Sequence, residues 1–257
     1  MRVAALQFKP VKGDRVESER RLLALLERLQ PPIDLVVLPE LALTGYLFSS
    51  RDQILPLTEP SDGPTAQLLA PVARRLGAFV VCGFPEREGQ TLYNSALVVG
   101  PDGAVDSVVR KTLLYSADVP WASPGDQPYR VIPTPAGTFA VGICMDLNDD
   151  RFIDWLTGAQ PDVLAFPTNW VDEGHDIWTY WAMQLWETRI SLVAADTYGT
   201  ETLDGVTTGF WGRSAIIEAA GQPGGPMTLL RAAPAEGDAV LVAQLELPRA
   251  RQEGLLA

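Results

Sequence analysis

The 257-residue sequence has little of what several kinds of functional site require. It contains two cysteines, Cys82 and Cys144, and a single histidine, His175, and no CxxC pair occurs. A structural zinc site normally takes four cysteine or histidine ligands, so we expect no metal. Two cysteines in a chain of this length, without a signal-peptide pattern at its start, favour reduced thiols and a cytoplasmic location.

Long apolar runs and positive charge are also scarce. No stretch approaches the roughly 20 consecutive apolar residues that a transmembrane helix needs, so we expect no membrane span. Lysine and arginine together number 20, against 32 aspartates and glutamates, which gives a formal net charge of −12. Because such a chain repels polyanions, we expect no nucleic-acid partner.

Segments with strand character alternate with amphipathic segments along the chain, without a repeat or a linker. Residues 33–40 and 162–170 are apolar runs bounded by turn residues, whereas leucines recur at helical spacing within residues 13–32. Unbroken apolar strands need cover on both faces, so we predict sheets buried beneath helices in one domain, residues 1–257. We also predict a helix over residues 172–189.

Three residues with chemically active side chains, Glu40, Lys111 and Cys144, each stand where an apolar strand runs out. Ligand sites of open α/β sheets gather at the carboxyl ends of strands, so we expect these side chains to meet in one pocket. There Glu40 can take the thiol proton and return it to a departing amine. Lys111 and the backbone N–H of Met145 can bind the developing oxyanion. Lys111 and the N-terminus of a helix that starts near residue 148 should also favour the thiolate.

Other interpretations of these residues stay open. Cysteine is among the most buried residue types, so either cysteine can be an inert core residue, and Cys82 fits that description. Glu40 and Lys111 can be solvated strand ends or a plain ion pair. A Cys–His dyad through His175 is a further alternative.

The motifs that carry these residues resemble those of the nitrilase superfamily of carbon–nitrogen hydrolases. "LVVLPELALTGY" contains Glu40, "VVRKTLLY" contains Lys111 and "VGICMDLN" contains Cys144, in the order that the family has. The resemblance implies a four-layer α-β-β-α sandwich, a Glu–Lys–Cys triad, no metal or organic cofactor, and a homodimer or larger homo-oligomer. The implied activity is hydrolysis of a linear amide or carbamoyl group to an acid plus ammonia or an amine, through a cysteine thioester. A true nitrilase, an acyltransferase on the same scaffold and a catalytically silent binding subunit remain alternatives.

Two positions depart from the family pattern. The resemblance places a second catalytic carboxylate at Asp118, where the family usually has glutamate, so the shorter side chain puts its reach in question. A solvated loop aspartate is the alternative. Asp196 stands where many members have asparagine, and we assign it no catalytic role. "KTLLYSADVPWA" and "CMDLN" are similar to the branch of protein N-terminal asparagine and glutamine amidases. Side-chain deamidation is therefore one candidate, beside small aliphatic amides, ω-amides and N-carbamoyl compounds.

Residues just beyond the three motifs are candidates for binding a small amide or carbamoyl substrate. Core packing is the alternative for the tryptophans, and it is the preferred interpretation for Trp178, Trp181 and Trp186. The aromatic-rich helix from about His175 to Arg189 is a candidate contact between two copies of the chain. The candidate substrate-binding residues are Tyr46, Tyr115, Trp121, Met145, Asn169 and Trp170.

Overall fold

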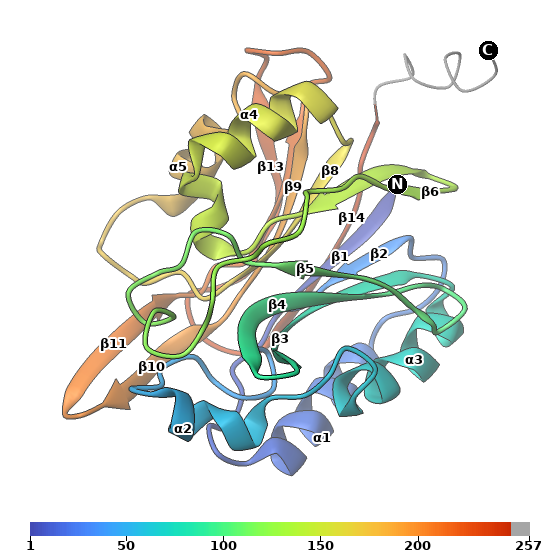
Figure 1. The fold of residues 1–257 in the computed structure, drawn as a ribbon. Coiled ribbons are helices and arrows are strands. Elements are labelled where there is room, and N and C mark those ends of the chain that lie inside the picture. Colours follow the sequence, from blue (N-terminus) through green and yellow to red (C-terminus); the bar gives the residue numbers. More distant parts are fainter. Residues whose placement is uncertain (248–257) are drawn as a thin grey trace.

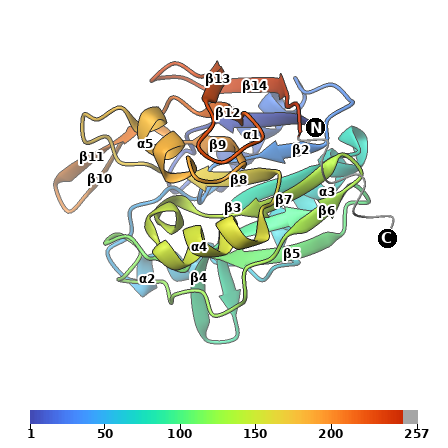
Figure 2. The same ribbon diagram turned by 90° about the horizontal axis from the view of Figure 1, so that it is seen from above.

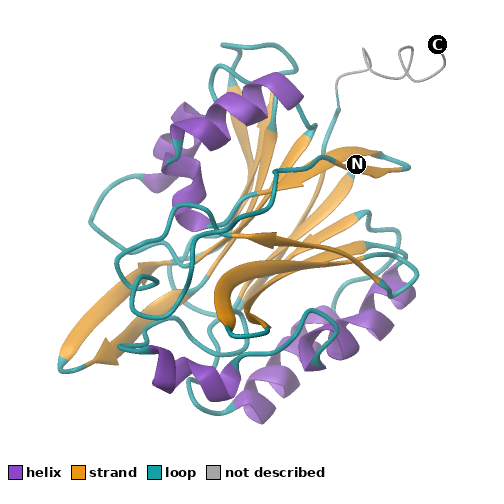
Figure 3. Cartoon of the chain, in the orientation of Figure 1, coloured by secondary structure: helices purple, strands orange, loops and turns teal. Residues whose placement is uncertain are grey.

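The structure is a computed structural model that describes residues 1–247; residues 248–257, the end of the expected domain, lie outside this description. Two mixed β-sheets lie face to face, with helices on their outer faces (Figures 1 and 3). This arrangement confirms the predicted α-β-β-α fold class. The first sheet has the order β14 (Ala239–Gln244), β1 (Arg2–Gln7), β2 (Leu35–Val37), β3 (Phe79–Glu88), β4 (Thr91–Val99) and β5 (Val105–Arg110).

The second sheet repeats the plan of the first, with three parallel strands at its centre and antiparallel strands at its edges. Because the carboxyl ends of parallel strands lie at the same end of a sheet, loops from both sheets can converge there. The second sheet has the order β13 (Met227–Ala232), β12 (Ala215–Ala219), β9 (Ser191–Asp196), β8 (Val163–Thr168), β7 (Gly137–Val141) and β6 (Ile132–Thr134).

Helices α1 (Arg15–Leu26) and α3 (Pro64–Leu76) cover the first sheet, and α4 (Asp150–Ala159) and α5 (Ile177–Gln184) cover the second (Figure 1). The short helix α2 (Arg51–Ile54) contributes Ile54 to a smaller apolar cluster with Tyr46 and Phe48. None of the helices within the described part of the chain has the length and apolar character that a bilayer span requires.

Alternating side chains build three apolar layers from these elements. In β2, Val36 belongs to the layer beneath α1 and α3, whereas Leu35 and Val37 belong to the layer between the sheets. Successive side chains of a strand point to opposite faces, so an all-apolar strand fills two layers at once. A third layer, which includes Phe152 and Trp181, lies between the second sheet and its helices.

The predicted helix over residues 172–189 is present, but both of its predicted boundaries are wrong. The helix α5 begins at Ile177, because the carboxylate of Asp176 caps it, and it ends at Gln184. Trp181 is fully buried as expected, but Trp186 is 44% exposed, so core packing is wrong for Trp186.

A two-stranded antiparallel hairpin, β10 (Tyr198–Leu203) and β11 (Val206–Trp211), stands apart from both sheets and projects from the sandwich (Figure 2). Its base continues directly from β9. It therefore lies beside the strand ends of the second sheet, next to the site described below.

Candidate active site

Glu40 follows β2 by three residues, and its side chain is fully buried. The chain there passes close to Gly83 of β3, where an added Cβ would lie 2.4 Å from the Cα of Glu40. Glycine at position 83 therefore makes room for this segment. The Glu40 Oε2 atom accepts a hydrogen bond from the backbone N–H of Asn169 at 2.9 Å, which ties it to the end of β8.

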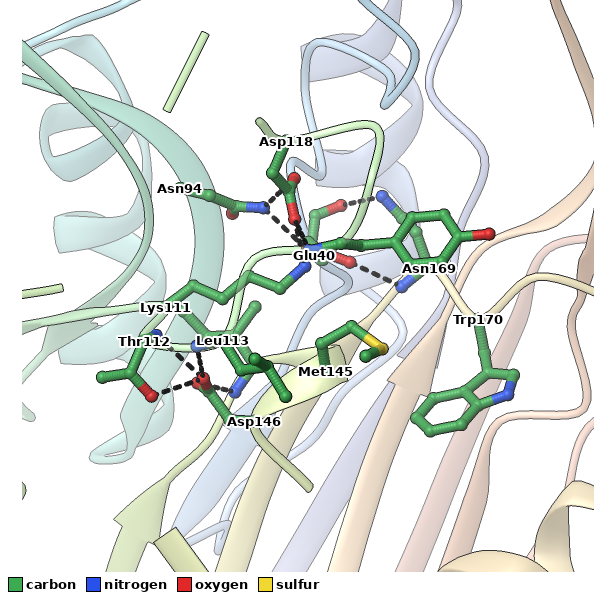
Figure 4. Close-up of polar contacts among 12 residues, drawn as sticks. Glu40, Asn94, Lys111, Thr112, Leu113, Asp118, Met145, Asp146, Asn169 and Trp170 are labelled. Atoms are coloured by element: carbon green, nitrogen blue, oxygen red, sulfur yellow. Dashed lines mark hydrogen bonds and ion pairs between the residues drawn. The ribbon is translucent and has the colours of Figure 1, made fainter. Parts of the chain in front are cut away.

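Lys111 directly follows β5, and its ammonium group lies between two carboxylates. Its Nζ atom is 2.7 Å from Glu40 Oε1 and 2.7 Å from Asp118 Oδ2, and all three side chains are fully buried. Figure 4 shows the three side chains converging, with Lys111 and Asp118 from the connection between β5 and β6 and Glu40 from the segment after β2. The structure thus brings Asp118 to the lysine despite its shorter side chain, and excludes a solvated loop aspartate.

Asn94 of β4 completes this cluster, and the sequence reasoning did not assign it a role. Its amide nitrogen donates to Glu40 Oε1 at 2.7 Å and to Asp118 Oδ1 at 2.9 Å (Figure 4). The backbone N–H of Tyr115 donates to Asp118 at 2.9 Å. Each carboxylate therefore accepts at least one hydrogen bond from a group other than the lysine, which fixes both in orientation.

Cys144 begins the 3₁₀ turn η2 (Cys144–Asn148), and its backbone has a φ of +45°. Positive φ is uncommon for a residue with a side chain and is often found at functional sites. Asp146 holds this turn: it accepts N–H bonds from Thr112 at 2.8 Å, Leu113 at 3.0 Å and Ile143 at 2.9 Å. The cysteine turn is therefore joined to the residues that follow Lys111 (Figure 4).

The electrostatics of Cys144 differ from the expectation. Burial, and after it the charge of Glu40, raises the pKa of the Cys144 thiol, and this outweighs the lowering by Lys111. The helix α4, expected to begin beside the sulfur, starts at Asp150, and the whole of η2 intervenes. Lys111 thus favours the thiolate as predicted, but burial and Glu40 favour the protonated thiol more strongly, and the expected contribution of the helix N-terminus beside the sulfur is wrong.

Glu40 and Lys111 respond to the same buried environment in different ways. Burial raises the pKa of Glu40, and the nearby Asp118 raises it further, whereas Lys111 lowers it. For Lys111, burial alone would lower the pKa, but Asp118 and Glu40 outweigh it, so the pKa is raised. The lysine remains a cation, while Glu40 is a stronger base than an exposed glutamate.

A cavity of about 520 Å³ opens onto Cys144. Five of the six candidate substrate-binding residues line it, and their roles there remain predictions. Trp121 is not among the lining residues; it is 4% exposed and packs with Tyr46 and Phe48, which favours a packing role. The candidates that line the cavity are Tyr46, Tyr115, Met145, Asn169 and Trp170, and the other lining residues are Asn148, Val171, Glu173, His175, Ile177 and Tyr180.

Several buried polar atoms around the sulfur have no hydrogen-bond partner within residues 1–247. They include the hydroxyl of Tyr46, the side-chain oxygen of Asn169 and one oxygen of Asp196. The Thr168 hydroxyl faces the thiol closely enough to lower its pKa. Buried polar groups without partners are uncommon, and Tyr46 and Asn169 line the cavity, so their oxygens are suited to receive polar atoms of a ligand. Residues 1–247 contain no group of three or more histidine, cysteine or carboxylate side chains placed to hold a metal ion.

Comparisons with known proteins agree with these observations. A family profile described as "Carbon-nitrogen hydrolase" matches residues 2–252. The chain is 29% identical over 178 residues to the protein N-terminal amidase of Saccharomyces cerevisiae. The aligned segment covers 60% of this chain but only 39% of that protein. It is 34% identical over 174 residues to a nitrilase of Pyrococcus abyssi, covering 66% of each chain. An omega-amidase of Xenopus laevis is 32% identical over 178 residues, which cover 65% of this chain and 62% of the relative.

Solved structures support the fold. An N-terminal amidase in complex with an Asn-Glu-Ala peptide superposes with a TM-score of 0.83 at 18% identity, covering 95% of this chain and 97% of the other. A mutant of a Nesterenkonia amidase from the nitrilase superfamily superposes with a TM-score of 0.79 at 21% identity, covering 100% and 95%.

Proposed function

The chain belongs to the carbon–nitrogen hydrolase family and is an enzyme of that family, and from this premise we propose that it hydrolyses amides through a thioester on Cys144. The observation that carries the proposal is the buried contact of Lys111 with Glu40 at 2.7 Å, next to a cysteine that lines a 520 Å³ cavity. A base, a cation and a nucleophile from three separate loops are thus held around one space.

In the proposed first half-reaction, Glu40 accepts the thiol proton as the sulfur of Cys144 bonds to the carbonyl carbon. Lys111 and the backbone N–H of Met145 stabilise the negative oxygen. The C–N bond then breaks, the nitrogen takes the proton from Glu40, and ammonia or an amine leaves. The raised pKa of Glu40 suits this role, because the same group must both accept and return a proton.

In the second half-reaction, a water molecule attacks the thioester carbon through its oxygen, and Glu40 accepts a proton from that water. The C–S bond breaks, the sulfur recovers the proton, and the carboxylic acid leaves. Asp118 takes no part in bond making here. It keeps the Lys111 ammonium in place, because Lys111 would otherwise have only Glu40 as a charged partner at close range.

The charge of the cavity wall supports a neutral or cationic substrate. Among the described residues that line the cavity there is no lysine or arginine, and Glu173 is the one carboxylate. A substrate carboxylate would find neither lysine nor arginine among these described wall residues, with His175 the one other basic side chain, whereas an ammonium group could lie near Glu173. This favours amides that carry a free amine, such as N-terminal glutamine or asparagine, over N-carbamoyl amino acids and ω-amides of dicarboxylic acids.

Ammonia release from a substrate panel tests the proposal. Glutamine amides with a free amine should be turned over faster than their N-acetylated forms, and N-carbamoyl amino acids and nitriles should be poorer still. If Cys144→Ala turns over any of these as fast as the parent protein, the assigned nucleophile is wrong. Preference for a carboxylate-bearing amide would overturn the substrate class but not the mechanism.

We also expect a cytoplasmic homodimer or larger homo-oligomer. The helix α5 exposes Met183 at 67%, and Trp186, two residues beyond its end, is 44% exposed, so this face of the molecule is a candidate contact between copies. A monomeric mass in dilute solution, measured by sedimentation equilibrium, would contradict this expectation.

A further inference from the structure

A second cavity lies beside the cavity of the candidate active site and shares a wall residue with it. Its volume is about 280 Å³, and Tyr115 lines both cavities. We call it the remote cavity; it is bounded by residues 47–49, by residues 115–117 with Pro120, and by Leu203, Val206 and Thr208 of the hairpin. Residues 47–49 directly follow Tyr46, which lines the first cavity, so the two walls are also continuous along the chain.

The hairpin that forms one wall of the remote cavity has a well-defined turn. Its two central turn residues, Asp204 and Gly205, have φ values of +51° and +79°. Positive φ at both positions is characteristic of a type I′ turn, whose twist matches that of the two strands. Leu203 and Val206, on either side of this turn, are therefore held at set positions.

The hairpin is also fastened to both walls of the first cavity. The carboxylate of Glu201 in β10 accepts backbone N–H bonds from Tyr46 and Leu47, each at 3.0 Å. On the other side, the backbone N–H of Trp211 in β11 donates to the carbonyl of Trp170 at 2.8 Å. The hairpin therefore connects the two walls, and the relative position of the two cavities is fixed.

The lining of the remote cavity is uncharged. Leucine, phenylalanine, valine, proline and alanine side chains supply most of it, and the polar groups are hydroxyls of serine, threonine and tyrosine. The exposed fraction is 5% for Phe48 but 67% for Val206, so the floor is closed and the rim is open to solvent. Such a site suits an uncharged, mainly apolar group that enters from outside.

We propose that the remote cavity binds the part of the amide substrate that lies away from the bond being broken, and that it selects an aromatic or branched aliphatic group there. This rests on the proposed amide hydrolysis. Tyr115 lines both cavities and the hairpin fixes their relative position. A group bound in the remote cavity therefore lies directly beside the first cavity, so we infer that it belongs to the same substrate molecule. The nearest cation, Lys12 beside Leu47 and Phe48, is not among the lining residues and is already paired with Glu201. An acidic group in the remote cavity would therefore lose its hydration without gaining a free cationic partner, so it is rejected.

Calorimetric binding to the Cys144→Ala protein tests this separately from turnover. The ligands are three dipeptides that differ only in the second residue: glutaminyl-glycine, glutaminyl-phenylalanine and glutaminyl-aspartate. We expect glutaminyl-phenylalanine to bind about tenfold more tightly than glutaminyl-glycine, and glutaminyl-aspartate to bind most weakly. Val206→Asp should remove the tenfold preference, whereas the matched control Val16→Asp, at a 78% exposed valine on α1, should keep it.

Equal affinity for the three dipeptides, or no binding of any of them, would overturn the proposal, and so would an equal effect of the two valine variants. Ammonia release by the parent protein reports the proposed function independently. Selective binding without ammonia release would support the remote cavity and contradict the amide hydrolysis. Ammonia release without selective binding of the dipeptides would support the amide hydrolysis and contradict the role of the remote cavity.

Discussion

Arg110 and Lys111 are neighbours in the chain, both are buried cations, and both are surrounded by carboxylates, yet their surroundings differ. The Arg110 guanidinium makes paired hydrogen bonds to Glu86 at 2.9 and 2.7 Å and reaches Glu88 at 2.9 Å and Asp126 at 2.8 Å. Glu88 and Asp126 are 65% and 62% exposed, so the Arg110 cluster extends into solvent. Excess negative charge there is screened by water and salt.

The Lys111 cluster is closed. Glu40, Asp118 and Lys111 have no exposed side-chain surface, and two carboxylates share one ammonium group. The negative charge in excess has no solvent to screen it, and burial raises the pKa of Glu40. The comparison teaches that a buried ion cluster becomes a proton acceptor when its charges are unequal and it is sealed from water beside a nucleophile.

Replacing one carboxylate in each cluster should give the largest difference in kcat between the two clusters. Glu40→Gln removes the proposed base and should lower kcat about 10³-fold while the protein stays folded. Glu86→Gln removes the paired partner of Arg110 and should cost stability, about 3 kcal/mol, while kcat per folded molecule changes less than about twofold. Steady-state ammonia release and thermal unfolding measure the two effects. A loss of kcat as large for Glu86→Gln as for Glu40→Gln would refute the distinction.

Exchanging the two cations is the next test. Lys111→Arg places a planar guanidinium where a compact ammonium fits between two carboxylates, so kcat should fall about 10²-fold. Arg110→Lys loses the paired hydrogen bonds, so it should lower the free energy of unfolding by about 2 kcal/mol without changing kcat. Activity and denaturant unfolding are measured on both proteins. If Lys111→Arg retains the parent kcat, Lys111 does not act at the reacting carbonyl.

Asp118→Asn should have a smaller effect. Asparagine keeps an oxygen near Lys111 but removes the charge. The loss of about 1.4 kcal/mol of charge-assisted hydrogen bonding should lower kcat/KM roughly tenfold. Circular dichroism should show an intact fold, because the contact with Asn94 can be rearranged. Full activity would show that the charge of Asp118 is not needed to hold Lys111 in place for catalysis.

The smallest effect concerns the pH dependence of stability through Asp196. Burial raises the pKa of this carboxyl well above its usual range, and one of its oxygens has no partner within residues 1–247. The folded state thus holds a proton that the unfolded chain releases, so its stability falls as the pH rises above the ordinary aspartate pKa of about 4. Asp196→Asn keeps an acceptor for the Trp170 N–H and loses no proton.

Thermal unfolding from pH 4 to pH 8 checks this. We expect the Tm of Asp196→Asn to exceed that of the parent by about 4 °C at pH 8, with the difference shrinking toward pH 4. A difference that is constant over this range would show that Asp196 is charged in the folded protein.

The fold was predictable where apolar patterning is unambiguous. The strands within residues 33–40 and 162–170 were predicted from local sequence alone and are confirmed as β2 and β8. The hairpin β10–β11 was missed, although "TLDGVT" contains the Asp-Gly signal of a type I′ turn. Its strands are rich in threonine, glycine and exposed side chains, so they lack the apolar alternation on which strand prediction depends.

The site was predictable where side chains follow strand ends, and less so where they lie within strands. Glu40, Lys111 and Cys144 could be grouped because strands end at a common edge of a sheet. Asn94 projects from the middle of β4, and only the three-dimensional packing brings it to Glu40 and Asp118. Burial also could not be judged locally, and at Cys144 it outweighs the stabilisation of the thiolate by Lys111 that was expected.

The central claim is that the Lys111 cluster activates the sulfur of Cys144 and no other thiol. The most direct measurement is acid quenching of the protein after mixing with a p-nitrophenyl ester, followed by peptide mass mapping. We predict one acyl group per chain on the peptide with Cys144, none on Cys82, and much slower acylation in Glu40→Gln. Release of p-nitrophenol with the acyl group on another residue, or on none, would contradict the account.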